Sequence, residues 1–129
     1  MIEPESALER LRAISKTCAF NCWLGLEVTA ASVGRAELQL AWRSEFGQYS
    51  GFLHAGIMGA LIDTACGFAA ATITADVLAS HNSVNFFRPA VALRFIARGK
   101  IVEAAFAGGN QVRAVYVDPE AIWLKSAAT

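Results

Sequence analysis

The sequence predicts an α+β fold in which a curved antiparallel sheet wraps around one long, buried central helix. The first observation is the order of the predicted elements: a helix, two strands, a long apolar helix and then four strands. The second is that residues of the strands alternate between apolar and polar, as in a sheet with one buried face. Strands that follow one another around a single helix define an α+β domain.

The chain length of 129 residues suits a single domain, which we expect to span residues 1–129. The composition is 55% hydrophobic and 17% charged, which is more apolar than that of an average soluble domain. Small domains of this kind often bury apolar surface between subunits, so we expect a homo-oligomer, either a dimer or a dimer of dimers.

The amino-terminal third is predicted to form a helix and a β-hairpin. The helix covers Pro4–Phe20, and the hairpin strands are Trp23–Ser32 and Arg35–Trp42, which are joined by a turn at Val33 and Gly34. The apolar residues of the helix recur at steps of three and four residues, as one buried helical face requires. They are Leu8, Leu11, Ile14 and Cys18.

A loop over Phe46–Leu53 leads into the long helix, which is predicted to run from His54 to about Thr74. Four strands follow, separated by turns that contain Pro, Gly, Asn and Asp. These strands are Ser80–Arg88, Ala92–Phe106, Gln111–Val117 and Ala121–Ser126.

The long helix has one bulky and one small face when its residues are placed about 100° apart. Ile57, Leu61 and Phe68 form the bulky row, which is expected to pack on the sheet. Met58, Ala65 and Thr72 flank that row. The opposite face carries Gly56, Gly59, Ala60, Asp63, Gly67, Ala70 and Thr74. A face reduced to small residues lets a partner or a ligand approach the backbone closely.

Asp63 is the only charged residue in the thirty-residue stretch Phe46–Ala75. Burying an ionisable group among apolar residues costs several kcal/mol unless it is paired or neutralised. A functional carboxylate explains its presence, and so does an Asp that is satisfied inside a tight subunit interface. The two interpretations are compatible if a site lies at the interface.

Composition and spacing argue against several other classes of protein. The 11 basic and 11 acidic residues cancel without a basic block, so a nucleic-acid partner is not expected. Three cysteines provide neither a disulfide framework nor zinc spacing, and no metal is expected. The first residues lack a secretory signal, which fits the cytoplasm. Ala55–Ala75 has the length of a membrane span, but its Ala, Gly and Thr content and its central Asp63 argue against one.

Three spaced motifs resemble those of the hotdog-fold acyl-CoA thioesterases. They are the run Gln48–Gly56, then Asp63 nine residues after His54, and then Asn85–Ala90. The most similar group is the phenylacetate-pathway branch of the 4-hydroxybenzoyl-CoA thioesterase superfamily. The resemblance covers roughly residues 23–126. It implies a helix wrapped by a curved sheet, active sites at a dimer interface, an acyl-CoA substrate and no cofactor.

The resemblance also implies roles for individual residues. Asp63 falls on the position of the general base or nucleophile, and Ala55 and Gly56 supply backbone N–H groups that polarise the thioester carbonyl. Gln48 replaces the family's Asn, Ala55 replaces a Gly, and the family's strand hydroxyl aligns near Ala79. The remaining residues expected at the substrate are His54, Gly51, Ser80, Ser83, Arg88 and Arg94. The histidine at the helix start is more often structural than catalytic in this family.

Arg94, Arg98 and Lys100 share one strand face, so with Arg88 they could hold the phosphates of coenzyme A, and a solvated face explains them equally well. Cys66 is interpreted as core packing. Two other functions stay open besides thioester hydrolysis. One is a non-catalytic acyl-CoA-binding protein, which the departures at Gln48 and Ala55 would fit. The other is a dehydratase or hydratase, which would need a His paired with an acidic residue, and the sequence shows no such pairing.

Overall fold

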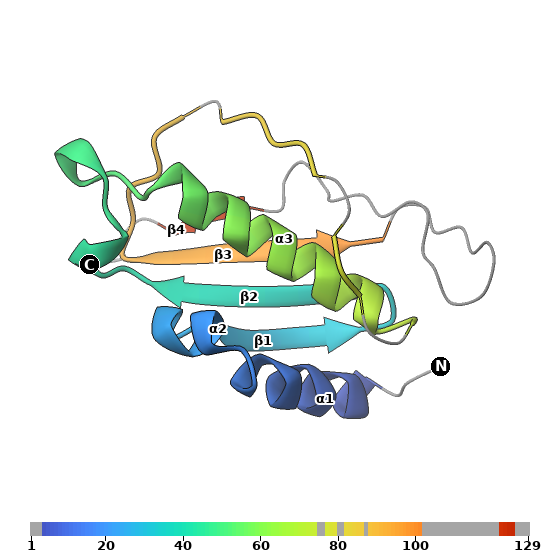
Figure 1. Ribbon diagram of the computed structural model, residues 1–129. Helices are drawn as coiled ribbons and strands as arrows, with labels where there is room; N and C mark the ends of the chain where they lie inside the picture. Colours follow the sequence, from blue (N-terminus) through green and yellow to red (C-terminus); the bar gives the residue numbers. More distant parts are fainter. Residues whose placement is uncertain (1–3, 75–76, 80–81, 87, 102–121, 126–129) are drawn as a thin grey trace.

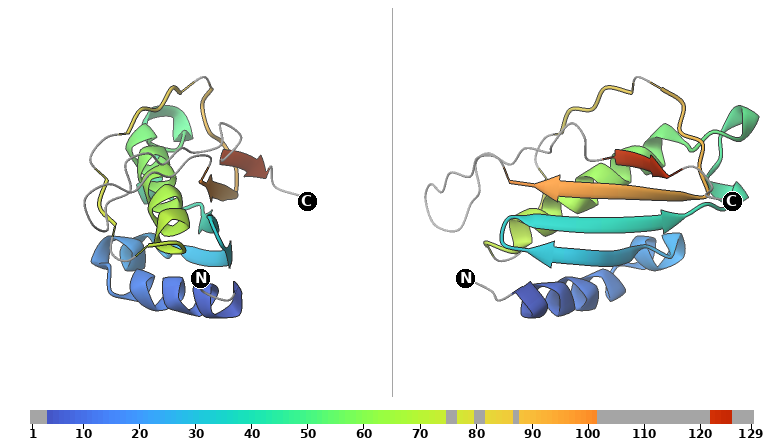
Figure 2. Two further views of the ribbon diagram at one scale, coloured as in Figure 1. Left: turned by 90° about the vertical axis from the view of Figure 1, so that its right-hand side faces the viewer. Right: turned by 180° about the vertical axis from the view of Figure 1, so that it is seen from behind.

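The computed structural model describes residues 4–74, 77–79, 82–86, 88–101 and 122–125. Its antiparallel sheet has the order β1-β2-β3-β4, and the long helix α3, Ala55–Ala71, lies across one face of this sheet (Figures 1 and 2). The strands are β1 Glu27–Ser32, β2 Arg35–Ala41, β3 Arg94–Lys100 and β4 Ile122–Lys125. A sheet with one long helix on its face confirms the predicted α+β fold.

The predicted helix Pro4–Phe20 is two helices, α1 Pro4–Lys16 and α2 Ala19–Leu24. The chain leaves the helical path at Cys18, whose φ of −96° and ψ of 110° are extended, and turns into α2. The prediction that a strand starts at Trp23 is also wrong. α2 continues to Leu24 and ends at Gly25, which has the left-handed conformation with φ +68°. Gly adopts this conformation without steric cost.

The β1–β2 hairpin turns at Val33 and Gly34, as predicted, and Gly34 has a φ of +75°. Along β2 the buried residues alternate as predicted, and they are Ala36, Leu38 and Leu40. α1 lies beside β1 at the edge of the sheet (Figure 1). There the Nε of Arg12 donates a hydrogen bond of 3.0 Å to the carbonyl of Val28, so a helix covers this strand edge.

The carboxyl-terminal strands agree only in part with the prediction. β3 lies inside the predicted strand Ala92–Phe106, and β4 lies inside Ala121–Ser126, whereas the predicted strand Gln111–Val117 lies outside the described residues. The described part of the predicted strand Ser80–Arg88 forms no strand. None of the side chains at 82–86 is fully buried. Packing against the core therefore does not stabilise a strand in this segment.

The bulky face of α3 packs on the sheet as predicted, with Leu61, Ala65 and Phe68 buried. Gly99 of β3 approaches so closely that an added Cβ would lie 2.5 Å from the carbonyl carbon of Ala65. One residue departs from the predicted pattern: Ala70, expected on the open face, is fully buried. The carboxyl end of α3 is enclosed on several sides, so its small face is not open there.

Candidate active site

Two of the sequence motifs meet in front of the start of α3. The loop before the helix closes on itself through a β-bridge between Gly47 and Leu53 and a 2.7 Å hydrogen bond from the Gln48 N–H to the Phe52 carbonyl. The N–H of Leu53 then donates to the carbonyl of Ala90 at 2.9 Å. This last bond joins the Gln48–Gly56 motif to the end of the Asn85–Ala90 motif, which explains how residues far apart in sequence share one site.

His54 caps the amino terminus of α3. Its Nδ1 accepts a hydrogen bond of 2.8 Å from the N–H of Gly56, one of the helix-end donors that have no intrahelical partner. The predicted structural role of His54 is consistent with this contact. Because Gly56 is engaged, the N–H of Ala55 is the donor without a hydrogen-bond acceptor among the described residues at the tip of the helix.

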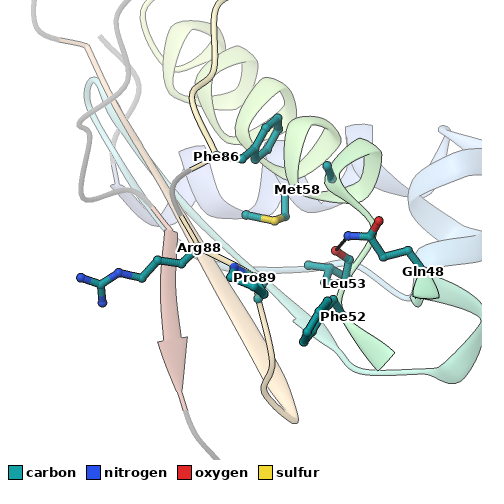
Figure 3. A pocket seen from close by; sticks show the side chains of 9 residues that line it. Gln48, Phe52, Leu53, Met58, Phe86, Arg88 and Pro89 are labelled. Carbon is teal, nitrogen blue, oxygen red and sulfur yellow. Dashed lines mark hydrogen bonds between the residues drawn. The ribbon is translucent and has the colours of Figure 1, made fainter. Parts of the chain in front are cut away.

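An open pocket of about 250 Å³ lies beside this helix start. Figure 3 shows Met58 and Phe86 on one side of it, with Phe52 and Leu53 opposite, and Gln48 at the side of the loop. Most of its lining is apolar. The full lining consists of Gln48, Phe52, Leu53, Ala55, Met58, Phe86, Arg88, Pro89 and Ala90. A concave apolar pocket with a few polar groups is typical of a small-molecule site.

Sequence reasoning identified Gln48, Ala55 and Arg88 in this lining and missed its apolar walls. Of those walls, Phe52 and Phe86 each stand beside a motif residue, and Met58 flanks the bulky row of the helix. Their apolar character gave no signal that separates a pocket wall from a core residue. Gln48 itself donates weakly to the Leu53 carbonyl, at 3.5 Å from its Nε2.

Asp63 lies on α3 away from the pocket and is exposed in the single chain, not buried as its surroundings in the sequence predicted. It follows Ala55 by eight residues, or about 12 Å along the helix axis. The neighbouring glycines of the same face, Gly59 and Gly67, have no described atom within 4 Å of an added Cβ. The small face around Asp63 is therefore open in the isolated chain.

Cys66 stands one turn beyond Asp63 and is not equipped as a nucleophile. Its burial, and secondarily the negative charge of Asp63, raise the pKa of the Cys66 thiol to about 11. The thiol is therefore overwhelmingly protonated at neutral pH, whereas a reactive cysteine needs a thiolate. This agrees with the interpretation of Cys66 as a packing residue.

The other predicted site residues lie apart from the pocket. Gly51 occupies the exposed loop with a φ of +74°. Ser83 is exposed and does not line the pocket, and Ser80 lies outside the described residues. Arg94 points to the face of the sheet opposite α3, because Gly99 faces the helix and alternate residues face away. There its Nη1 donates to the Oε1 of Gln39 at 3.1 Å.

Arg98 shares that outer face and forms an ion pair with Glu37, with its Nε 2.8 Å from Oε2. Arg88 is the only arginine among the described residues that lines the pocket. Its side chain is exposed and points away from the pocket interior (Figure 3).

No three His, Cys, Asp or Glu side chains gather to hold a metal ion in the described part of the chain. Nor does any helix described there have the length and apolar character to cross a membrane.

The antiparallel sheet, the long helix across its face and the pocket at the helix start match a hotdog-fold domain. A profile of the Thioesterase superfamily matches residues 50–105. The structure is similar to that of a thioesterase family protein from Silicibacter pomeroyi, with a TM-score of 0.72, 32% sequence identity, and coverage of 75% of this chain and 74% of that chain. The chain belongs to the thioesterase superfamily.

Two further similarities are less specific. A protein from Saccharolobus solfataricus whose name describes a candidate esterase is 29% identical over 104 residues, or 79% of this chain and 73% of the relative. The PaaI protein from the phenylacetic acid degradation operon of Escherichia coli has a TM-score of 0.71 at 21% identity, with 77% of this chain and 72% of that chain covered. At that identity the similarity shows a shared fold and leaves the phenylacetate-pathway branch a prediction.

Proposed function

We propose that this protein hydrolyses an acyl-CoA thioester to a free acid and CoA. Membership of the thioesterase superfamily supports hydrolysis of a thioester or ester in general. The observation that carries the finer proposal is the helix start, where the N–H of Ala55 has no acceptor among the described residues and opens onto an apolar pocket. Donors at a helix amino terminus stabilise negative charge that develops on a carbonyl oxygen.

In the proposed reaction, the thioester carbonyl oxygen accepts a hydrogen bond from the N–H of Ala55. Water attacks the carbonyl carbon while the carboxylate of Asp63 accepts its proton, and the C–S bond breaks as the protonated Asp63 returns that proton to the leaving CoA thiolate. If Asp63 attacks instead, water cleaves the resulting anhydride. In either case one carboxylate and one helix-end donor must reach the same carbonyl group.

The separation along α3 shows what this mechanism requires. Ala55 and Asp63 of one helix are about 12 Å apart along its axis, which is too far for both to contact one carbonyl. We therefore propose a homodimer in which Asp63 of one copy faces the Ala55 N–H of the other. A second copy would also cover the small face around Gly59 and Asp63, which is open in the single chain.

Arg88 is proposed to contact the phosphates of CoA. It stands at the pocket, is exposed, and has no hydrogen bond or ion pair among the described residues. A guanidinium group suits phosphate recognition because its donors match the phosphate oxygens in pairs. Arg94 is less suited because it lies on the opposite face of the sheet and bonds Gln39.

Release of CoA from a panel of acyl-CoA thioesters, followed with a thiol reagent, tests the proposal. Asp63→Asn keeps the shape of the side chain but cannot accept a proton, so kcat is expected to fall by about 10²–10⁴-fold. Arg94→Gln on the opposite face is the matched control and should retain wild-type kcat. The catalytic proposal fails if the wild type releases no CoA, or if Asp63→Asn is as active as the wild type.

One observation favours a second candidate, a non-catalytic acyl-CoA-binding protein. Asp63 is exposed and lies outside the pocket of its own chain. Saturable binding of acyl-CoA without release of CoA, in a protein that sediments as a monomer, would favour binding over hydrolysis. A dehydratase or hydratase gains no such support, because Nδ1 of His54 is used on the backbone of Gly56 and not on an acidic side chain.

A further inference from the structure

We propose that the pocket at the start of α3 receives the acyl group of the thioester, and that Met58 limits this group to about ten non-hydrogen atoms. The inference rests on the proposed function and adds the class of acyl substrate. It is drawn from the chemistry of the lining, from the volume of the pocket and from the position of Met58.

The chemistry of the lining matches a hydrocarbon better than the pantetheine arm of CoA. That arm carries two amides and a hydroxyl, and polar groups removed from water need hydrogen-bond partners. The lining offers only two polar side chains, those of Gln48 and Arg88. Gln48 already lies within 3.5 Å of the Leu53 carbonyl, and Arg88 points away from the interior (Figure 3). The remaining walls suit an alkyl chain or an aromatic ring.

The volume of the part of the pocket that this chain lines gives a scale for the group that it can hold. A protein cavity of about 150 Å³ accommodates benzene, which has six non-hydrogen atoms. By the same proportion, the pocket of about 250 Å³ accommodates about ten. A saturated chain of six to ten carbons or a single substituted ring would fill it. A sixteen-carbon chain would leave its outer part in water, and that part would gain no burial.

Met58 is placed to set the limit. It follows Ala55 by three residues, so the two lie on the same side of α3, and its side chain lines the pocket below Phe86 in Figure 3. An acyl group whose carbonyl contacts the Ala55 N–H and whose chain enters this pocket therefore runs past Met58. The unbranched thioether is half-buried and packs in part against the core. Because it can adjust its shape, a change in its volume changes the usable depth of the pocket.

The experiment measures kcat/KM for acetyl-, butyryl-, hexanoyl-, octanoyl-, decanoyl- and palmitoyl-CoA with the wild type, Met58→Phe and Met58→Ala. For the wild type we expect an optimum between six and ten carbons and at least a tenfold lower value for palmitoyl-CoA. Met58→Phe should move the optimum at least two carbons shorter, and Met58→Ala at least two carbons longer. Ile57→Val, next in sequence but outside the lining, is the control and should keep the wild-type profile.

Two results would overturn the inference: wild-type palmitoyl-CoA hydrolysis as efficient as that of octanoyl-CoA, or an optimum that neither Met58 variant moves. If the wild type hydrolyses no thioester, the proposed hydrolase function fails separately. Dissociation constants from isothermal titration of the same acyl-CoAs then test the pocket alone. Binding should be tightest between six and ten carbons and should shift in opposite directions in the two variants, and a flat profile would contradict the inference.

Discussion

The two ends of α3 differ in how firmly the rest of the chain holds them. At the carboxyl end, the four consecutive residues Ala69–Thr72 are all buried. The hydroxyl of Thr72 accepts the N–H of Gly34 at 2.7 Å and donates to the carbonyl of Ala69 at 2.7 Å. At the amino end no residue from 55 to 60 is fully buried, and the helix starts beside the pocket.

This difference indicates a division of labour along one rigid element. The carboxyl half, clamped between the hairpin turn and the sheet, fixes the direction of the helix axis. The first turns of the amino half present Ala55 and Met58 to the pocket, and there Ile57 and Met58 are only partly buried against the core. Sites held on a regular element keep their geometry more tightly than sites on loops alone. Changes at the clamped end should therefore affect stability, and changes at the open end should affect activity more than stability.

The largest expected effect comes from Gly99→Ala, which disrupts the close packing of β3 against α3. The added methyl group would lie 2.5 Å from the carbonyl carbon of Ala65 and closer still to its oxygen, so strand and helix must separate. We expect a loss of about 3 kcal/mol or more in the free energy of unfolding, measured by urea denaturation. Gly67→Ala is the control, because no described atom lies within 4 Å of the added group.

For Gly67→Ala, helix propensity within the single chain predicts a gain of up to about 1 kcal/mol, which contact of the added methyl group with a second copy on this face would reduce. Equal unfolding free energies for Gly99→Ala and the wild type would show that β3 does not clamp α3 in this way.

A medium effect is expected from His54→Ala at the open end. The variant loses the acceptor for the Gly56 N–H, which His54 supplies at 2.8 Å, and loss of an N-cap typically costs about 1 kcal/mol. Because the first turn then frays, kcat for thioester hydrolysis should fall by more than the loss in the free energy of unfolding accounts for. His54→Asn supplies another capping oxygen and should restore most of both. If kcat and the free energy of unfolding are unchanged in His54→Ala, the His54 cap contributes neither to catalysis nor to stability.

The same contrast explains which features the sequence could predict. The face of α3 that packs on the sheet was predictable because it carries bulky residues at helical spacing, such as Leu61 and Phe68, and both are buried. The break at Cys18 was not, because the apolar spacing continues through it and only Gly25 marks the later stop. At the site, Gln48 and Ala55 could be identified because they stand in a motif. The apolar pocket walls could not, since Met58 has the same pattern as a core residue.

The smallest effect is expected on the outer face of the sheet, far from both ends of α3. The hydrogen bond from Arg98, and to a lesser degree that from the hydroxyl of Thr29, hold the pKa of Glu37 below its usual value of 4.5. A lowered pKa means that folding favours the carboxylate. The contribution of Glu37 is therefore fully present above the unfolded-state pKa and is lost as the pH falls through the lower folded-state pKa.

Glu37→Gln should accordingly lower the free energy of unfolding by at most about 1 kcal/mol near pH 7, since Arg98 is half exposed and water screens the pair. The difference from the wild type should shrink steadily below pH 4.5, because a protonated Glu37 resembles Gln. Urea denaturation across pH 3–7 measures it, with thioester hydrolysis at pH 7 as the second readout. If the outer face is independent of α3, kcat stays at the wild-type value. A fall in kcat as large as that of His54→Ala would mean that the sheet transmits changes on its outer face to the helix start.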